Sequence, residues 1–382
     1  MATTGTASLP TLGILGGGQL GRMTALAAVR MGMRVRILTP EATGPEAAFA
    51  DVIFADWTDP FVLRSFAEAC DVVTVESEWA PADRLADVLP EGVALWPSPE
   101  TLHLVRHKGR QREALAARGL PQPGFALCAT LDEAHAAAAT LGYPVVLKQY
   151  ERSYDGYGNA TARDAAALAE AWPKLAADDG LLVEQFVPFE DELAVHVARR
   201  ADGRRVIYPI AWTEQREHRC HAVVVPAPIP EATAAEARLV AEACAEAVEV
   251  VGILGVELFR TRDGRVLVNE LAPRPHNTAH YTIEGCHTSQ FENHVRAVLG
   301  WPLGDPALRV PAACMVNVLG HTSGPTNLRH LPDALAVPGA AVHLYGKHDV
   351  RPRRKMGHVT VTANDPAAAR AHAEEAAARL RL

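Results

Sequence analysis

The chain has 382 residues, 48% hydrophobic and 21% charged, an ordinary composition for a globular protein of two or three domains. Its net charge of −8 disfavours non-specific binding to nucleic acid or to an anionic membrane, and no long apolar run predicts a membrane span. The six cysteines are scattered singly, so neither a disulfide framework nor a zinc knuckle is indicated. The first ten residues lack the pattern of a signal peptide, and we expect a cytoplasmic protein.

The first unit, residues 1–102, has the pattern of an α/β domain. Residues 11–39 have the pattern of a strand, a glycine turn, a helix and a second strand. Two further short apolar strands are expected, at residues 71–77 and 93–98. Strands that alternate with helices predict a parallel sheet with crossover helices.

The glycine turn of this domain, Gly16 to Gly21, fits the pattern G-x-G-x-x-G between a strand and a helix. This pattern is the fingerprint of a dinucleotide site, and Glu41 lies where a ribose-binding acid is expected. The same glycines also fit a tight turn with close helix packing, so the turn alone leaves an NAD site open. Glu76 ends the strand at 71–77, where side chains of a parallel sheet reach the ligand crevice.

A second α/β unit follows, and its elements can be placed from their apolar patterns. One helix is expected over residues 103–119, closed by Gly119, and a strand over 144–150. The strand at 181–187 is followed by a hairpin around Asp202-Gly203 and by a long Ala-rich helix from about residue 231 to residue 251.

Polar residues of this unit follow one another in an order that suits nucleotide chemistry. Lys148 ends an apolar strand, and a strand lysine pointed at phosphates recurs in phosphoryl transfer. The glycine-bearing loop 153–159 is expected to close over a triphosphate as a lid. The strand residues 184–187 could meet an adenine edge, and Glu192 could reach a ribose hydroxyl. Lys108 precedes all of them, and the order of these residues gives them more weight than any one alone.

Two apolar runs flank Asp263-Gly264, which predicts a β-hairpin with a two-residue turn. Counting outward from that turn, Thr261 faces Val266, Phe259 faces Val268, and Glu257 faces Glu270. Two carboxylates directly opposite each other repel unless a cation lies between them. Carboxylate oxygens completed by phosphates and water suit Mg²⁺, although a surface hairpin with splayed glutamates also fits the pattern.

Cationic and amide side chains follow this hairpin at once. Arg274, His276 and Asn277 are positioned to hold an anion beside the metal. Near the end of the chain, Arg351, Arg353, Arg354 and Lys355 form a dense basic cluster. In a chain of net negative charge, this cluster fits either a solvated surface turn or a grip on a phosphate.

Three motifs together resemble the ATP-grasp superfamily and, within it, the N5-carboxyaminoimidazole ribonucleotide synthetase family. They are GILGGGQLGRM at 13–23, VNELAPRPHNTAHYTIEGCHTSQFENHVRAVLGWPLGD at 268–305 and RPRRKMGHV at 351–359. The resemblance covers nearly the whole chain. It implies a mixed α/β and α+β fold: a Rossmann-like domain over 1–102, an ATP-grasp domain over 103–308 and a small C-terminal domain over 309–382.

The resemblance also implies a reaction and the residues that carry it out. The family carboxylates 5-aminoimidazole ribonucleotide with ATP and bicarbonate, which suggests a Mg²⁺-dependent ligase of purine biosynthesis and a homodimer. The matching ATP-binding residues are Lys108, Lys148, Glu184, Val187, Glu192 and Asn269, and the metal ligands are Glu257 and Glu270. The matching residues at the carboxyphosphate are Arg274, His276 and Asn277, with Lys148. Those around the ribonucleotide are Gln19, Glu76, Tyr154, Asp155, Arg351, Arg354 and Lys355.

The chain departs from the family pattern near the expected site. Arg152-Ser153 replace two glycines, Tyr157 replaces a cation, Glu217-His218-Arg219 replace Asp-Gly-Ile/Val, and Thr278-Ala279 replace Ser-Gly. A paralogue that carboxylates a different amine, as in secondary metabolism, therefore stays open as an alternative. An NAD-dependent oxidoreductase is the other alternative, but it leaves the paired glutamates, both lysines and the basic cluster without a role.

Overall fold

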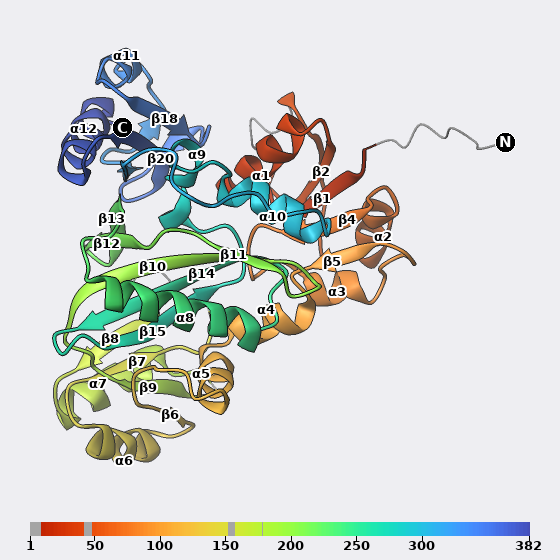
Figure 1. Cartoon of the computed structure of the whole chain (residues 1–382). Coiled ribbons are helices and arrows are strands. Elements are labelled where there is room, and N and C mark those ends of the chain that lie inside the picture. The colour runs from red at the N-terminus through yellow and green to blue at the C-terminus, as the bar shows by residue number, and fades with distance from the viewer. Residues whose placement is uncertain (1–8, 42–47, 152–156, 178) are drawn as a thin grey trace.

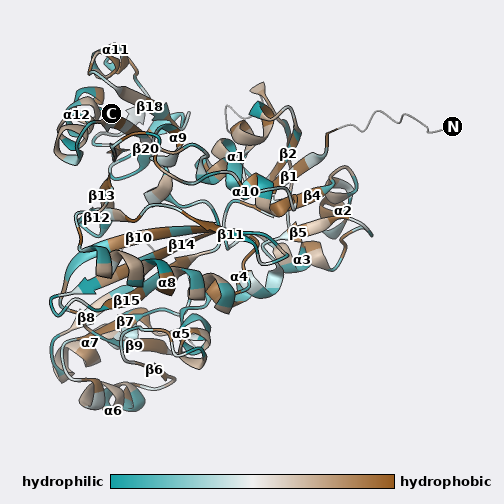
Figure 2. Ribbon diagram, in the orientation of Figure 1, coloured by the Kyte–Doolittle hydropathy of each residue, from teal (hydrophilic) through white to brown (hydrophobic). Residues whose placement is uncertain are grey.

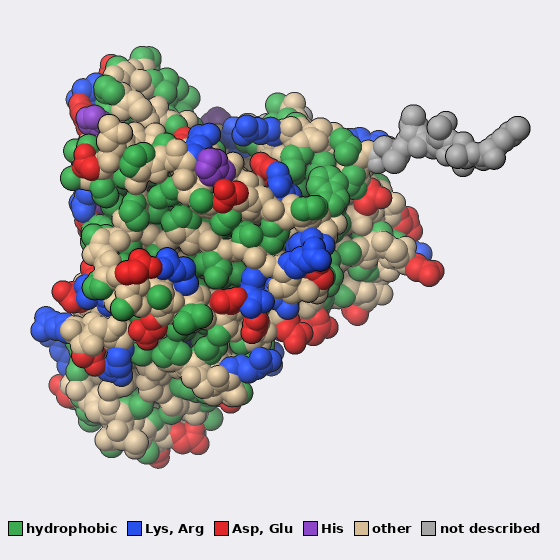
Figure 3. Space-filling view, in the orientation of Figure 1, with side chains coloured by type: hydrophobic (Ala, Val, Ile, Leu, Met, Phe, Trp, Pro, Cys, Tyr) green, Lys and Arg blue, Asp and Glu red, His purple; other side chains and the backbone are tan. Residues whose placement is uncertain are grey.

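The computed structural model describes residues 9–41, 48–151, 157–177 and 179–382 (Figure 1). Within these residues the strands form a five-stranded, a four-stranded, a nine-stranded and a two-stranded sheet. Brown, hydrophobic stretches follow several strands, and the helices alternate between hydrophilic and hydrophobic residues (Figure 2). On the face shown in Figure 3, Lys and Arg side chains are interspersed with Asp and Glu. None of the helices in the described ranges is both long and apolar enough to cross a membrane.

The N-terminal sheet is parallel, with strand order β3-β2-β1-β4-β5, which confirms the predicted Rossmann-like domain. Apolar side chains on both faces bury its central strands beneath the helices. The sequence analysis did not predict β3, α2 or α3. The elements are β1 Thr11–Leu15, α1 Gln19–Arg30, β2 Arg34–Thr39, β3 Asp51–Phe54, α2 Pro60–Glu68, β4 Val72–Val75, α3 Ala82–Ala86 and β5 Ala94–Trp96.

The helix predicted over residues 103–119 is two helices, α4 Pro99–Arg106 and α5 Lys108–Ala117. The helical conformation is interrupted at His107, whose backbone is extended at φ −96° and ψ 103°. The His107 Nδ1 atom accepts the backbone N–H of Arg110 at 3.2 Å and so caps the second helix. The prediction of one helix was wrong because a capping imidazole looks like any other helical residue in the sequence. The break places Lys108 at the first position of α5.

A small four-stranded antiparallel sheet follows, with strand order β6-β9-β7-β8. Its strands are β6 Phe125–Cys128, β7 Val145–Lys148, β8 Asn159–Ala162 and β9 Leu181–Gln185. The helices α6 Leu131–Leu141 and α7 Ala165–Leu175 pack on it around a common apolar core. The predicted strands at 144–150 and 181–187 are confirmed, and Lys148 is the last residue of β7.

The largest sheet is antiparallel and runs β15-β14-β10-β12-β13-β16-β20-β18, with β11 paired to β10. Its C-terminal strands therefore continue the sheet of the central region, across the predicted domain boundary at 308. The strands are β10 Phe189–Arg199, β11 Arg205–Ile207, β12 Ala211–Arg216, β13 Arg219–Val225, β14 Gly252–Thr261, β15 Val266–Ala272, β16 Ala312–Leu319, β18 Ala340–Leu344 and β20 Lys355–Ala363.

The two faces of this sheet are covered differently. On one face, α8 Glu231–Ala247 packs on β10, β14 and β15, and α12 Pro366–Leu380 packs on β13, β16 and β20. Trp212 joins these two apolar cores on the same face. The segment after β15 packs on the other face, where the polar side chains of the site lie. It contains η2 Asn277–Ala279, α9 Thr282–Gly285 and α10 Gln290–Val298, while β17 Gly324–Pro325, α11 Leu331–Leu335 and β19 Asp349–Val350 lie in the C-terminal part.

The turn between β14 and β15 differs from the predicted two-residue turn. Thr261 donates its backbone N–H to the carbonyl of Arg265 at 3.0 Å, so three residues form the turn. Gly264 in this turn has a φ of 86°, a conformation that glycine adopts without steric cost. The Asp-Gly pair was read as the whole turn, whereas Gly264 is the last residue of a longer one.

The strand register of this hairpin differs from the predicted one near the turn and agrees with it at the glutamates. Leu258 faces Val268 and Phe259 faces Leu267, so the predicted pairs near the turn, Phe259 with Val268 and Thr261 with Val266, are wrong. A bulge beside Glu257 then shifts the register by one residue. Glu257 consequently faces Glu270, which confirms the predicted carboxylate pair.

Candidate active site

Two cations converge on the buried carboxylate of Glu184. Lys148 Nζ lies 2.6 Å from Glu184 Oε2, and Arg112 pairs with the other carboxylate oxygen. Burial raises the pKa of Glu184, but Arg112 and Lys148 outweigh burial and hold that pKa at about 2. The Glu184 side chain is only 3% exposed and anchors Lys148. Any contact of Glu184 with an adenine ring therefore has to come from its backbone.

Arg112 is a central residue of the site that the sequence analysis missed. Its guanidinium also donates to the backbone carbonyls of Val268 and Asn269, each at 2.8 Å. It therefore ties α5 to both β9 and β15. A signal was available, because Arg112 stands four residues after Lys108 and so lies on the same helix face.

The two facing glutamates form the acidic part of the site. Lys108 Nζ lies 3.0 Å from Glu270 Oε1, which leaves Glu257 as the less compensated carboxylate. Burial, followed by repulsion from Glu270 and Glu192, raises the pKa of Glu257 to about 8. Burial also raises the pKa of Glu192, which is half-buried on β10. Carboxylates arranged in this way fit a hard divalent cation.

Two carboxylates are an incomplete ligand set by themselves. The described part of the chain contains no cluster of three or more His, Cys, Asp or Glu residues able to hold a metal ion. Mg²⁺ commonly takes one or two carboxylates and completes its shell with phosphate oxygens and water. The donor set therefore fits a magnesium ion that arrives with a nucleotide better than a permanent structural metal.

The predicted anion-binding residues lie next to this pair. Arg274 donates from Nε to Glu78 Oε2 at 2.6 Å, which links the central region to the end of β4. Burial raises the pKa of Glu78, but the charge of Arg274 and its hydrogen bond outweigh burial and leave the pKa lowered. His276 Nε2 lies 3.8 Å from Glu257 Oε1. The Asn277 amide pairs twice with Asn317 of β16, at 2.9 and 2.7 Å, and the sequence analysis missed Asn317.

The glycine turn encloses Glu76 instead of leaving room for a dinucleotide. Gly21 donates its backbone N–H to Glu76 Oε2 at 2.8 Å. A Cβ at Gly16 would lie 2.3 Å from the Glu76 side chain, and one at Gly18 would lie 2.4 Å from its carboxylate. The carboxylate thus occupies the start of α1, where a pyrophosphate binds in dinucleotide domains. Gln19, half-buried, is the first residue of α1.

The basic cluster divides between two environments. Arg351 is exposed, whereas Arg354 and Lys355 are half-buried. Arg354 donates to the carbonyl of Asp349 at 2.8 Å, and the charge of Lys355 lowers the pKa values of both Glu257 and His276. Lys355 is therefore close enough to the acidic pair to act on it.

Lys347 joins this cluster, and the sequence analysis did not find it. Lys347 Nζ donates to the backbone carbonyl of Lys355 at 2.7 Å. Burial, with the charges of Arg354 and Lys355, lowers the pKa of Lys347 to about 8, while Glu76 acts in the opposite direction. Only the folded hairpin of β18 and β20 brings Lys347 beside Lys355.

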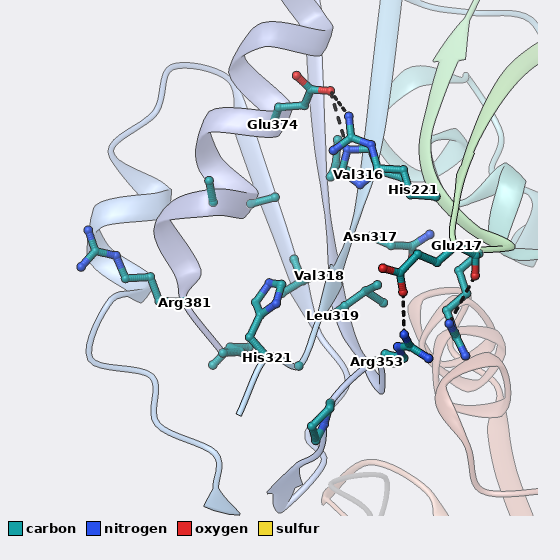
Figure 4. A pocket seen from close by; sticks show the side chains of 17 residues that line it. Glu217, His221, Val316, Asn317, Val318, Leu319, His321, Arg353, Glu374 and Arg381 are labelled. Atoms are coloured by element: carbon teal, nitrogen blue, oxygen red, sulfur yellow. Dashed lines mark hydrogen bonds and ion pairs between the residues drawn. The ribbon is translucent and has the colours of Figure 1, made fainter. Parts of the chain in front are cut away.

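A cavity of about 640 Å³ lies between β13, β16 and α12 (Figure 4). Arg353 of the basic cluster lines it and bonds to Glu217 at 2.8 Å, as the dashed line in Figure 4 marks. Asn317 also lines this cavity and bonds to Asn277, so the cavity and the anion-binding residues share one amide pair. Arg353 thus belongs to this cavity and is already paired with an acid.

The remaining predicted residues have mixed positions. Val187 is buried and follows β9, and Asn269 is the half-buried residue at the hairpin bulge. Tyr154 and Asp155 lie outside the described residues, as does most of the predicted lid loop. Tyr157, at the end of that loop, lies 5.8 Å from the guanidinium of Arg219 in a cation–π contact.

Comparison with known proteins agrees with this geometry. Residues 9–106 match the ribonucleotide synthetase preATP-grasp domain, residues 113–291 the ATP-grasp domain, and residues 313–372 the phosphoribosylaminoimidazole carboxylase C-terminal domain. The N5-carboxyaminoimidazole ribonucleotide synthase of Synechococcus elongatus is 41% identical over 354 residues, covering 92% of this chain and 89% of the relative.

Two solved structures are similar over nearly their whole length. The N5-carboxyaminoimidazole ribonucleotide synthetase from Thermotoga maritima has a TM-score of 0.87 and 38% identity, covering 98% of this chain and 99% of that one. The N5-carboxyaminoimidazole synthase from Aspergillus clavatus, in complex with ADP and 5-aminoimidazole ribonucleotide, has a TM-score of 0.89 and 32% identity. That match covers 97% of this chain and 98% of the Aspergillus chain.

The fold, the Lys148–Glu184 pair, Lys108 beside Glu270 and the facing glutamates, together with these matches, define an ATP-grasp ligase. The predicted fold class and ATP-dependent chemistry are confirmed, and the alternative of an NAD-dependent oxidoreductase is wrong. Within this class, the chain belongs to the N5-carboxyaminoimidazole ribonucleotide synthase family.

Proposed function

We propose that this protein carboxylates the amine of 5-aminoimidazole ribonucleotide, with ATP and bicarbonate as co-substrates. The products are N5-carboxyaminoimidazole ribonucleotide, ADP and phosphate. The observation that carries the proposal is the position of the Glu257–Glu270 pair. Lys108 adjoins this pair on one side, and the charge of Lys355 from the C-terminal cluster reaches it as well.

The nucleotide end of the site is proposed to use the central region. Glu257 and Glu270 would hold Mg²⁺, which neutralises charge on the β- and γ-phosphates of ATP when it is bound. Lys108 and Lys148 place two further positive charges at the phosphates. Glu184 fixes Lys148, and the adenosine is assigned to the Glu184 and Val187 backbone, to Glu192 and to Asn269.

The central chemical step is the attack of a bicarbonate oxygen on the γ-phosphorus, which forms carboxyphosphate and releases ADP. Arg274, His276 and Asn277 are proposed to hold this anion, because they adjoin the facing glutamates. Positioned positive charge in a site that excludes water is the main source of catalysis in such a transfer. The amine then attacks the carbon of carboxyphosphate, the bond between this carbon and the phosphate oxygen breaks, and either the departing phosphate or His276 removes the amine proton.

The ribonucleotide is proposed to lie between the N-terminal and C-terminal parts. Its 5′-phosphate is assigned to Arg351, Arg354 and Lys355. Lys347 is added to them because its ammonium group donates a hydrogen bond to the Lys355 carbonyl and is affected by the charges of Arg354 and Lys355. Gln19 and Glu76 flank the base and ribose from the glycine turn, and Tyr154 and Asp155 are assigned to the same ligand. The names of the relatives favour this amine over the different acceptor of a paralogue.

Two further parts of the proposal concern the setting of the enzyme. We expect a homodimer, as the family resemblance implies, and a cytoplasmic location. Sedimentation of the purified protein decides the first, and a mass close to twice 41.0 kDa is the expected result.

The proposed reaction is tested by following an oxygen atom. Because a bicarbonate oxygen attacks phosphorus, ¹⁸O-labelled bicarbonate should transfer one label to each phosphate formed in the presence of the ribonucleotide. Mass spectrometry of the phosphate measures the transfer. Unlabelled phosphate formed at the rate of ADP would mean that water attacks ATP, and it would reject the proposed reaction.

A further inference from the structure

A buried histidine, His196, and a half-buried one, His276, are joined to one threonine hydroxyl beside Glu257. His276 Nδ1 lies 2.8 Å from Thr278 Oγ1, and His196 Nε2 lies 3.0 Å from the same oxygen. His196 and Thr278 are 0% and 1% exposed. The hydroxyl therefore links the two rings by hydrogen bonds, and it is shielded from water.

The ring of His276 has little freedom to move away from this link. Gln290 accepts the His276 backbone N–H at 2.8 Å and donates to the His276 carbonyl at 2.7 Å. Gly255, the strand neighbour of His196, leaves room for both rings, since a Cβ there would lie 2.9 Å from the Cβ of His276. The position of the His276 ring is thus fixed, and only the directions of the hydrogen bonds in the network can vary.

A hydroxyl has one proton to donate, so it joins two neutral imidazoles in only two ways. Burial keeps the ring of His196 neutral, because it lowers the pKa of His196 to about 3, and the hydroxyl needs an acceptor nitrogen on one ring for its own proton. Thr278 either donates to His276 and accepts from His196, or donates to His196 and accepts from His276. Each choice fixes the tautomer of both rings.

Two features of the structure favour the first arrangement. His196 Nδ1 is buried and has no hydrogen-bond partner among the described residues. Orphaned buried donors are rarer than under-satisfied acceptors, so His196 should carry its proton on Nε2, toward Thr278. On the other side, His276 Nε2 lies 3.8 Å from Glu257 Oε1, and once Glu257 is ionised as a metal ligand its carboxylate attracts an N–H and repels a lone pair.

We infer that His196 and Thr278 are positioning residues that hold His276 as its Nε2–H tautomer, so that it presents a proton, not a lone pair, to the reacting anion. This inference rests on the proposed function for its catalytic meaning. The tautomer itself follows from the hydrogen-bond network and can be tested without turnover. In this arrangement His276 is a hydrogen-bond donor to carboxyphosphate and does not take up the amine proton.

The tautomer is read from two-bond ¹H–¹⁵N correlation spectra of the imidazole rings in ¹⁵N-labelled protein bound to Mg²⁺ and ADP. The His276→Gln spectrum identifies the signals of His276. The expected result is a protonated Nε2 and an unprotonated Nδ1 at His276. A His276 ring protonated on Nδ1 overturns the inference.

Paired substitutions separate positioning from general stability. His196→Leu and Thr278→Val each remove a hydrogen-bond donor from the His196–Thr278–His276 network. His196→Gln keeps an N–H near the Nε2 position, and Thr278→Ser keeps the hydroxyl. We expect the first two variants to mix the His276 tautomers and to lower kcat for ADP formation about tenfold, with the KM for ATP unchanged. The second two should restore kcat to within about twofold.

His294→Leu is the matched control. His294 is also 0% exposed, burial likewise lowers its pKa to about 3, and it bonds to Thr74 and the Ile253 N–H away from the site. This control should lose stability but leave the His276 tautomer and kcat unchanged. If His196→Leu fails to fold, Thr278→Val provides the same test.

The inference is rejected if both Leu and Val variants keep the tautomer and kcat of the unaltered protein. An unaltered protein that shows the Nε2–H tautomer but no bicarbonate-dependent ADP formation would reject the proposed function, while the positioning of His276 would stand.

Discussion

At the scale of single residues, neighbouring charges give two buried glutamates opposite properties. Glu184 meets Arg112 and Lys148, which overcome the effect of burial and keep it ionised, with a pKa of about 2. Glu257 meets Glu270 and Glu192, which add to the effect of burial and raise its pKa to about 8. The charge of Glu184 is thus balanced within the folded protein, whereas Glu257 lacks a cation that a substrate complex can supply.

Replacing Glu270 with Gln tests the proposed metal pair. Removing one ionised ligand should lower Mg²⁺-dependent ADP formation by about 100-fold or more, because a bound metal supplies several kcal/mol of charge stabilisation. Circular dichroism should show an unchanged fold. Glu246→Gln, which alters a half-buried glutamate of α8 that bonds to Arg205 at 2.8 Å, is the control and should leave activity intact. Near-normal ADP formation by the Glu270 variant would refute the metal assignment.

The lowered pKa of Lys347 predicts a pH dependence. Burial brings that pKa to about 8, so the charge of Lys347 is present below this pH and lost as the pH rises through it. The value of kcat/KM for the ribonucleotide should therefore fall between roughly pH 7 and 9.5. Lys347→Arg should remove this decline, because arginine keeps its charge throughout the range. The same decline in both proteins would show that another group titrates and that Lys347 does not bind the phosphate.

At the scale of elements, one buried side chain holds three of them together. Arg112 extends from α5 to Glu184 on β9 and to two carbonyls on β15. It is 2% exposed, so losing it leaves a buried carboxylate and two buried carbonyls with fewer partners.

Arg112→Leu should lower the free energy of unfolding by about 3–5 kcal/mol, the usual effect of removing one partner of a buried ion pair. Urea denaturation measures the change. Lys174→Ala breaks an exposed pair with Glu170, in which the side chains are 65% and 75% exposed, and should change stability by less than about 1 kcal/mol. Equal effects of the two substitutions would contradict the role given to Arg112.

Local patterns in the sequence predicted many of the helices and strands, but most contacts between these elements could not be predicted. The facing of Glu257 and Glu270 was predicted, yet the true turn is one residue longer and a bulge compensates for it. Strand periodicity carries no signal for such a bulge. The break at His107 was hidden because its cap depends on a side-chain hydrogen bond.

Residues that only the folded chain brings together were missed for the same reason. Lys347 and Asn317 reach the site through the pairing of β16, β18 and β20, which are distant in sequence from the motifs of the central region. Glu78 follows the strand predicted at residues 71–77, but its partner Arg274 is 196 residues away in the chain.

At the scale of the whole molecule, the central and C-terminal parts share one sheet. The strands β13 and β16 are neighbours, and α12 packs on both. The apolar side chains of Ala222 and Val224 on β13 are buried by residues of the C-terminal part. The domain boundaries near residues 102 and 308 remain predictions, and the second one crosses this sheet.

A chain shortened to residues 1–308 should therefore fail to fold into a stable protein. It would expose the edge of β13 and the apolar face that α12 covers, and such surfaces aggregate. Solubility and the urea unfolding curve, each compared with the full-length chain, measure the result. A soluble product with a cooperative transition would show that the C-terminal strands are an independent domain.

In the proposed reaction, ATP cleavage is coupled to carboxylation of the ribonucleotide. The most direct measurement counts ADP formed and ¹⁴C-bicarbonate fixed by the purified protein with Mg²⁺, with and without 5-aminoimidazole ribonucleotide. We predict that the ribonucleotide accelerates ADP formation and that one labelled carbon is fixed for each ADP. ADP formation that is indifferent to the ribonucleotide, or that proceeds without fixation of the label, would contradict this prediction.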